Sequence, residues 1–477
     1  MSSRMQARLT TAADGAVVAA LVLAIFVALF GGFTLHLGPV EVRVHAPERL
    51  LFIALALAAI RHAANPIDPL HRRLLRAMRN RPDGSARAIV PAAISSRVAV
   101  LIVGYLAVCT IGVASTSVGF QVSPRPLVNL PARFDAGWYS GTALEGYEFS
   151  GNWNRQQNIA FFPALPMLMR AAGYPLGAFA PRVPRELRIA RLIWGGVLIS
   201  IAAFAWAAVY MSRLARDTIG ELHAASAVAL MAAYPFAVFF SAPYSESLFL
   251  LGCLGAIYHF RRQELGAAAA WGLLVGLTRP NGCFLSVVLA VLILESRWRN
   301  PSDAATARVP NLPMARSLAA AAAPGLGMLA FSTYVYSLTG DFFGWARMHE
   351  AWGRSYEGLA PVTRAYGWLV DEGLITVVQN VPYDTMNSLG IIFALAMLWP
   401  VLRRLGVAYG VFILINIVPP MLAGGVLSMG RLTATLFPIF LALAVVVPAR
   451  AVPPLITAFA IAQGLAAVLF FTWRPLF

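Results

Sequence analysis

Charged residues are scarce in this chain, and lysine is absent from it. Of its 477 residues, 59% are hydrophobic and 12% are charged, and the mean hydropathy is +0.70. The sequence also lacks a phosphate loop of the form GxxxxGK[ST] and a glycine-rich dinucleotide fingerprint. These absences argue against a soluble globular protein and against a cytosolic nucleotide-binding domain.

Cysteine is also rare, and no pair has the spacing of metal ligands. Cys109, Cys253 and Cys283 all fall in or next to apolar runs, which predicts reduced, buried thiols. His349 and Glu350 are adjacent, but they have neither HExxH spacing nor a Cys/His cluster around them. We therefore expect no metal site and no bound cofactor.

Long apolar runs are abundant, and many approach the roughly 20 residues that cross a bilayer as a helix. They predict an all-α polytopic membrane protein with about 11–13 transmembrane helices. The first run follows Arg4 and Arg8 without a convincing cleavage site, so we expect it to be kept as a span. The candidate spans are 15–35, 49–63, 96–118, 189–211, 224–240, 245–260, 266–278, 282–295, 317–338, 388–402, 405–423, 432–449 and 452–471.

The formal net charge of +16 comes entirely from arginine. In a soluble protein it would suggest nucleic acid, but here the positive-inside rule is the better explanation, and we expect no nucleic-acid partner. With the N-terminus in the cytoplasm, the arginine-rich loop 61–88 falls inside. The long stretches 119–188 and 339–387 then fall outside. Neither is Ser/Gly-rich, and we expect one membrane domain over 1–477, with a short surface helix at 159–171.

Asp135 is the first candidate for chemistry, because a carboxylate stands beside two aromatic residues where the chain leaves the membrane. It follows Arg133 and precedes Trp138 and Tyr139. It either caps a helix that begins near residue 136 or takes a proton from an attacking hydroxyl as a general base. The aromatic residues, with Tyr147, are either interfacial belt residues or a platform for a sugar or a prenyl chain.

Two arginines near broken apolar runs are the second group of candidates. Arg279 either forms a structural pair with Glu246 or binds a phosphate group with its guanidinium fork. Arg431 is either a snorkelling side chain or a second phosphate ligand. Glu246 is either a helix-start acid or a polar residue that faces a cavity. The polar turns around these residues must be buried in protein or line a wet cavity in the outer leaflet.

Five segments together resemble the PIG-V type mannosyltransferases, which are membrane enzymes of the GT-C class. Phe134, Pro280 and Leu432 depart from the family pattern. The matching segments, in order, are Arg133-Phe-Asp-Ala-Gly-Trp-Tyr139 with Gly146-Tyr147, Phe161-Phe-Pro-Ala-Leu-Pro166, Phe239-Phe-Ser-Ala-Pro-Tyr-Ser-Glu-Ser-Leu248, Gly276-Leu-Thr-Arg-Pro-Asn-Gly282, and Ser428-Met-Gly-Arg-Leu432 with Phe437-Pro438.

The resemblance implies a GT-C fold with short interfacial helices in the first outer stretch. It implies inverting transfer of a sugar, such as mannose, from a polyprenyl-phosphate donor to a glycolipid or glycan hydroxyl at the extracytoplasmic face of the cell membrane. Asp135 would be the base, and Arg279 and Arg431 would bind the donor phosphate. The other motif residues expected to contact substrate are Arg133, Trp138, Tyr139, Tyr147, Tyr244, Glu246 and Asn281.

Two alternatives remain at this point. A transporter or flippase of a lipid-linked sugar also needs a charged cavity and polar breaks in its spans. A flippase needs a matching cavity on the inner face, however, and the polar breaks here gather on one side. A scaffold subunit that has kept the fold without activity is the second alternative, although the acid and both arginines are retained.

Overall fold

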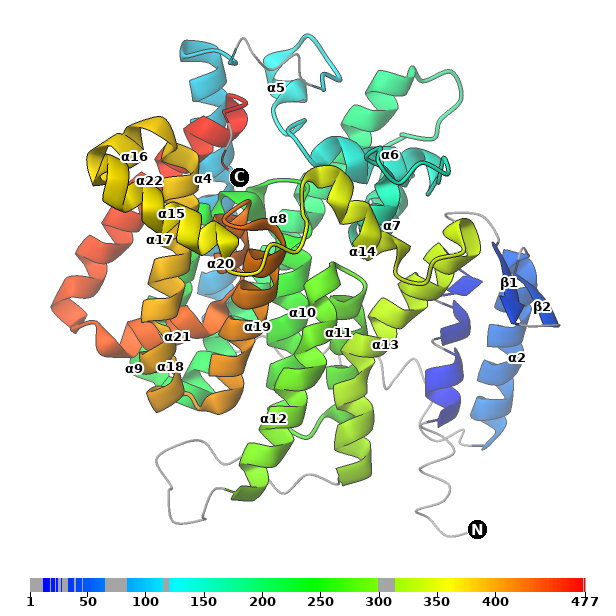
Figure 1. Cartoon of the computed structure of the whole chain (residues 1–477). Coiled ribbons are helices and arrows are strands. Elements are labelled where there is room, and N and C mark those ends of the chain that lie inside the picture. The colour runs from blue at the N-terminus through cyan, green and yellow to red at the C-terminus, as the bar shows by residue number, and fades with distance from the viewer. Residues whose placement is uncertain are drawn as a thin grey trace.

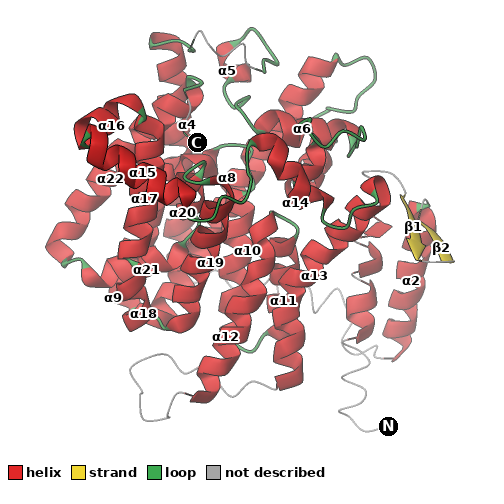
Figure 2. Ribbon diagram, viewed as in Figure 1, coloured by secondary structure: helices red, strands yellow, loops and turns green. Residues whose placement is uncertain are grey.

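Helices make up most of the chain that the computed structural model describes (Figure 2). The described residues are 12–64, with gaps at 18, 22, 25–26, 28–32, 38–39 and 45, then 84–114, 120–298, 314–474 and 476. The predicted class, a helical polytopic membrane protein, is confirmed. The two strands in the described residues form a hairpin of β1 (Phe33–Leu37) and β2 (Val40–Val44), paired antiparallel.

The helices of the first half include the longest one, α8, which packs against α4, α7, α9 and α10. Short 3-10 segments separate several of the helices. In chain order the elements are α2 (Pro47–Ala64), α4 (Gly84–Thr110), α5 (Pro126–Asn129), α6 (Ala136–Glu145), η1 (Asn158–Ala160), α7 (Ala164–Gly173), α8 (Arg185–Ile219), α9 (Glu221–Ala233), η2 (Pro235–Ser241), α10 (Glu246–Arg261), α11 (Leu265–Gly276), η3 (Pro280–Phe284) and α12 (Leu285–Trp298).

The helices of the second half return along the first and end with α22 against α4 and η2. They are α13 (Met314–Thr339), α14 (Gly344–Met348), η4 (His349–Trp352), α15 (Ala360–Glu372), α16 (Leu374–Asn380), α17 (Pro382–Ala396), α18 (Leu398–Arg404), α19 (Val407–Gly424), α20 (Met429–Thr433), α21 (Phe437–Val446), η5 (Ala449–Ala451) and α22 (Val452–Phe471).

Seven helices of the described chain are long and apolar enough to cross a membrane. An eighth is added if the bent pair α9 and η2 counts as one span. The seven are Ala86–Thr110, Arg185–Ile219, Pro280–Arg297, Met314–Thr339, Pro382–Arg404, Val407–Gly424 and Ala449–Phe471.

The predicted count of about 11–13 spans is higher than this because several apolar runs form helices shorter than a bilayer. The predicted span 266–278 is α11, which has 12 residues and ends before Arg279-Pro280. The predicted span 432–449 contains α21, with 10 residues. Proline and polar residues end these runs, since proline removes a backbone donor and restricts the residue before it.

The first predicted span, 15–35, falls partly outside the described residues, and its last residues form β1 instead of helix. Apolar and polar residues alternate in Phe33–Leu37 and in Val40–Val44, and Gly38-Pro39 separates them in the sequence. A period of two with a turn pair between the runs favours a hairpin over a helix. The hairpin precedes α2, at the edge of the molecule away from α22 (Figure 1).

The predicted span 224–240 is broken at Pro235, where α9 and η2 meet at 79°. A break inside a membrane domain leaves backbone carbonyls that need new donors. Arg97, a fully buried side chain of α4, donates to the carbonyls of Ala232 (2.5 Å) and Ala237. Gln463 of α22 donates to Ala232 and Tyr234 at 3.0 and 2.8 Å. The bend is therefore held by side chains from two other helices.

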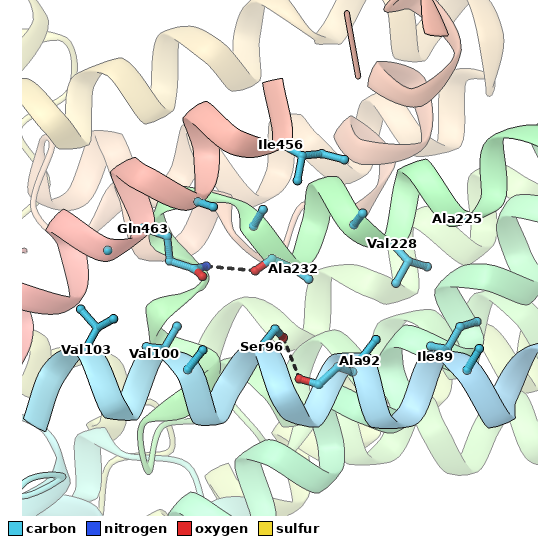
Figure 3. A pocket seen from close by; sticks show the side chains of 17 residues that line it. Ile89, Ala92, Ser96, Val100, Val103, Ala225, Val228, Ala232, Ile456 and Gln463 are labelled. Atoms are coloured by element: carbon cyan, nitrogen blue, oxygen red, sulfur yellow. Dashed lines mark hydrogen bonds between the residues drawn. The ribbon is translucent and has the colours of Figure 1, made fainter. Parts of the chain in front are cut away.

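Next to this bend, α4, α9 and α22 enclose an apolar hollow of about 550 Å³ (Figure 3). Most of its lining is alanine, valine and isoleucine. Its polar side chains, Ser96 and Gln463, already bond to backbone carbonyls. No residue predicted to take part in chemistry lines this hollow.

The two predicted outer stretches consist of short helices at one end of the molecule. The first contains α5, α6, η1 and α7, and the second contains α14, η4, α15 and α16. Figure 1 shows α5, α6 and α14 at the end opposite the end of α12, with α20 near them. This arrangement brings the motif segments of the first and last thirds of the chain together.

Candidate functional site

Asp135 lies at the start of α6, but its side chain does not cap the helix. Its Oδ2 lies 2.7 Å from Nη1 of Arg431. The preceding residue, Phe134, has φ of 46°, a left-handed conformation that is rare for a bulky residue. Phe134 packs on Phe470 and Trp473 with ring centroids 5.7 and 4.5 Å apart. The strained turn, held by aromatic packing, directs Asp135 toward Arg431.

Arg431 reaches the site from α20, a one-turn helix that follows Ser428, itself at φ of 60°. Gly430 permits the close approach of this turn to η2, because a Cβ at that position would lie 2.2 Å from the Phe236 ring. The guanidinium carbon of Arg431 stands 5.5 Å from the centre of the Tyr244 ring. Burial alone would lower the pKa of Arg431, but Glu246 and Asp135 together raise it.

Glu246 joins the two predicted phosphate ligands. Its Oε1 lies 2.7 Å from Nη2 of Arg279 and 3.2 Å from Nε of Arg431. The Glu246 and Arg279 side chains are 1% and 8% exposed, whereas Arg431 and Asp135 are 16% and 19% exposed. The structural pair considered for Arg279 is therefore present. The Nη1 atom of Arg279 is buried and has no hydrogen-bond partner within the described residues.

Hydroxyl groups of three neighbouring residues connect the acids to the surrounding backbone. Tyr244 is fully buried, and its hydroxyl accepts from the Asp135 amide (3.1 Å) and donates to the Arg133 carbonyl (3.2 Å). The Ser245 hydroxyl accepts from Arg279 Nη2 (3.1 Å) and from the Tyr139 hydroxyl (3.3 Å). Burial, then Glu246 and Asp135, raise the pKa of Tyr139, so its hydroxyl stays protonated.

A third guanidinium group comes from the second outer stretch. Arg354 Nη2 donates to the carbonyl of Leu427 at 3.2 Å. Burial and the charge of Arg431 lower the pKa of Arg354 to about 10, while Asp135 acts in the opposite direction. No carboxylate pairs with Arg354 within the described part of the chain. Sequence reasoning missed this residue, although it lies five positions after His349, in a stretch rich in aromatic residues.

His349 is the other titratable group on this side of the site. Its Nε2 is buried and has no hydrogen-bond partner among the described residues. Burial, then Arg354 and Arg431, lower the pKa of His349 to about 4. The imidazole is therefore uncharged at neutral pH and adds no positive charge to the cluster.

The cluster as a whole carries one uncompensated positive charge. Arg279, Arg354 and Arg431 are three cations, and Asp135 and Glu246 are two anions. Guanidinium groups offer planar forks that match phosphate oxygens. The arrangement therefore suits an anionic ligand beside a partly exposed carboxylate that can accept a proton.

Three residues predicted to contact substrate have polar groups that bond to other parts of the fold. Arg133 is 1% exposed and donates to the carbonyls of Phe471, Asn129 and Ala132 at 2.7, 2.7 and 2.9 Å. Tyr147 is buried and donates to the Phe161 carbonyl at 2.7 Å. Asn281 donates to Asn416 Oδ1 of α19 at 2.6 Å. These polar groups are occupied by intramolecular bonds, and the contact of the three residues with substrate stays a prediction.

Trp138 is partly exposed and stands at the border between the two outer stretches. Its ring stacks on Phe161 at 5.9 Å and meets Trp352 edge-on at 5.4 Å, between ring centroids. Trp138 also lines a polar groove of about 430 Å³ on the first outer stretch. Within the described residues no group of three or more His, Cys, Asp or Glu side chains is placed to hold a metal ion. The expected independence from metal stays a prediction.

The sequence over residues 105–338 matches the family model described as mannosyltransferase (PIG-V). The protein is therefore a multi-pass membrane glycosyltransferase. Asp135, Glu246 and Arg279 lie within the matched residues, and Arg354 and Arg431 lie beyond them.

Among solved structures, this chain is similar to the crystal structure of ArnT from Cupriavidus metallidurans bound to undecaprenyl phosphate. The TM-score is 0.41 with 14% sequence identity, and the similarity covers 80% of this chain and 77% of that chain. No curated protein matches the sequence.

Proposed function

We propose that this glycosyltransferase is a GT-C type enzyme that moves mannose from a polyprenyl-phosphate donor to a hydroxyl group of a glycolipid or glycan. The observation that carries the proposal is the cluster of Asp135, Glu246 and three arginines with one surplus positive charge. A lipid monophosphate sugar supplies an anionic headgroup and a hydrocarbon tail for a membrane enzyme. It also requires no nucleotide-binding domain, and the sequence contains none of the nucleotide-binding motifs sought.

The proposed reaction is a single inverting displacement. The acceptor oxygen attacks the anomeric carbon, and the bond from that carbon to the phosphate oxygen breaks. The hydroxyl proton goes to Asp135, and the bonding electron pair leaves with the polyprenyl phosphate. Arg431 engages Oδ2 of Asp135, and no described residue bonds to Oδ1. The free oxygen is the proton acceptor in this mechanism.

The leaving phosphate would be stabilised by guanidinium groups that are already in position. Arg431 and Arg354 are partly exposed, and Arg279 offers Nη1, which has no partner among the described residues. Glu246 keeps Arg279 and Arg431 next to each other. Preorganised donors of this kind act where charge develops during the reaction.

We also propose that the site faces the extracytoplasmic side of the cell membrane. The short outer helices surround the site at one end of the molecule (Figure 1). Arginines gather at the opposite ends of the spans, in Arg297, Arg403 and Arg404 among others. The positive-inside rule places that arginine-rich end in the cytoplasm.

The test uses purified enzyme in detergent with polyprenyl-phosphate mannose labelled in the sugar. We expect transfer of label to a glycolipid fraction, slow release of free mannose without acceptor, and inversion at the anomeric carbon. Asp135→Asn should lower transfer by about 10²–10⁴-fold, the usual contribution of a general base. Transfer by Asp135→Asn near the wild-type rate would disprove the base assignment. Movement of intact donor across vesicles without transfer would indicate a flippase.

A further inference from the structure

The polar groove on the first outer stretch lies on the same helix face as Asp135. Its floor is α6, where Trp138, Gly141, Thr142 and Glu145 line it. Positions three or four residues apart share one face of a helix, so these residues continue the face that begins at Asp135. With a rise of about 1.5 Å per residue, Gly141 lies about 9 Å from Asp135 along the helix axis.

The groove combines an aromatic wall with polar groups that are free to bind. Trp138 and Phe149 supply the aromatic surface. The side chains of Glu148 and Arg155 are exposed and make no hydrogen bond or ion pair with the described residues. A concave surface that pairs aromatic rings with donors and acceptors suits a polyhydroxylated ligand better than a hydrocarbon chain.

The wall of the groove is held in place before any ligand arrives. Asn158 donates to the Gly146 carbonyl (2.8 Å) and accepts from the Glu148 amide (3.1 Å). Gln157 accepts from the Ser150 amide and donates to the Asn152 carbonyl, both at 2.6 Å. These amide side chains fix the loop that faces α6. A fixed wall reduces the entropy lost when a ligand binds.

The groove also reaches the second outer stretch, which supplies Arg354. Gln156 Nε2 donates to the carbonyl of Ala351 at 3.3 Å. Trp352 meets Trp138 edge-on. Through Gln156 and Trp138 the groove therefore adjoins the stretch that carries Arg354.

We propose that this groove binds the saccharide part of the acceptor and delivers its hydroxyl group along α6 to Asp135. This inference rests on the proposed function and adds to it the place and the chemical class of the second substrate. The donor would occupy the arginine side of Asp135, and the acceptor sugar would occupy the Trp138–Gly141 side. The acceptor hydroxyl then approaches the anomeric carbon of the donor from the side opposite the leaving phosphate, as an inverting displacement requires.

Gly141→Leu tests the inference because a Cβ at Gly141 would meet no atom within 4 Å. Leucine is a better helix former than glycine, so α6 should persist while the side chain fills the groove. Gly367→Leu is the matched control, since Gly367 is a helical glycine of α15 with equally open surroundings. Gly141→Ala adds only a methyl group and should behave like the wild type within about two-fold.

The assay measures two reactions with polyprenyl-phosphate mannose. One is transfer to a chloroform–methanol glycolipid extract of the membranes from which the enzyme is prepared, and the other is release of free mannose to water. In Gly141→Leu we expect the apparent KM for the extract to rise at least about ten-fold, because a ten-fold change in affinity corresponds to about 1.4 kcal/mol, the size of one good contact. The KM for the donor and the rate of mannose release should stay near those of Gly367→Leu.

Equal transfer by Gly141→Leu and Gly367→Leu would overturn the inference, and so would a parallel loss of transfer and mannose release in Gly141→Leu. Wild-type enzyme that releases mannose from the donor but labels nothing in the extract would also overturn the inference about the groove. The proposed use of the donor would still stand in that case. Wild-type enzyme that neither transfers nor releases mannose would instead disprove the proposed function itself.

Discussion

Arg431 Nη1 and Asp135 Oδ2 lie 2.7 Å apart although 296 positions separate the two residues in the chain. The contact joins the first outer stretch to the turn that precedes α21. It also joins the proposed base to a proposed phosphate ligand. A change at either residue therefore affects proton transfer and the charge of the site together, and charged hydrogen bonds of this kind are stronger than neutral ones.

Arg431→Lys should lower kcat/KM for the donor by at least about ten-fold, even though the charge is kept. Arginine meets Asp135 with one nitrogen and Glu246 with another, and a lysine ammonium cannot reproduce this planar fork. The measurement is steady-state transfer with varied donor. Activity of the lysine variant equal to the wild type would show that only the positive charge matters here.

Glu246→Gln should destabilise the protein strongly. Arg279 and Arg431 share the buried Glu246 carboxylate, and the substitution would leave both guanidinium groups without its negative charge. Removing one member of a buried ion pair costs about 3–5 kcal/mol. Glu357→Gln is the control, since Glu357 pairs with Arg364 at the exposed surface of the second outer stretch, where such pairs contribute about 0–1 kcal/mol. The readout is the thermal unfolding midpoint in detergent. Equal midpoints of the two variants would contradict the central role of Glu246.

Arg354→Ala should raise the KM for a phosphate donor, since it removes the cation that has no carboxylate partner among the described residues. Hydrogen bonds to charged groups contribute about 1.5–3 kcal/mol, so we expect a loss of about 10–100-fold in kcat/KM. Arg364→Ala, which removes an exposed cation of α15, should leave the donor KM unchanged. A donor KM in Arg354→Ala equal to that of Arg364→Ala would remove Arg354 from the phosphate site.

Stability should fall as the pH is lowered from about 6.5 to about 4, in part because of His349. Burial, Arg354 and Arg431 lower the pKa of His349 to about 4 from its ordinary value of 6.5. As the pH falls, the unfolded chain therefore takes up a proton at His349 at a higher pH than the folded chain does. Lowering the pH in this range favours unfolding. Through this residue, the free energy of unfolding should fall by about 3 kcal/mol in total as the pH is lowered.

His349→Gln should remove this part of the pH dependence. The thermal midpoint of the variant should change less than that of the wild type between pH 7 and pH 4.5. His223→Gln, in α9 at the other end of the molecule (Figure 1), is the matched control and should follow the wild type. Identical profiles for His349→Gln and wild type would show that the imidazole does not resist protonation.

The long helices were predictable from sequence because their apolar runs exceed the thickness of a bilayer. Residues 189–211 and 317–338 lie inside α8 and α13. The short helices were not predictable as such. The hydropathy of an apolar run of 10 to 13 residues does not distinguish part of a membrane span from a helix too short to cross the bilayer. The apolar run 224–240 predicts one span, and only the fold shows that it bends at Pro235 and that Arg97 and Gln463 satisfy the carbonyls freed there.

By itself, the sequence determined the membrane class and singled out Asp135, Arg279 and Arg431 as candidates, because hydropathy and the motif segments are local features. Only the tertiary structure decided which partners those groups have. Glu246 is shared by Arg279 and Arg431, Arg354 arrives from a stretch without a motif, and Arg133 and Tyr147 are turned into the fold. Ion pairs and grooves arise from residues far apart along the chain, so their geometry depends on how the helices pack.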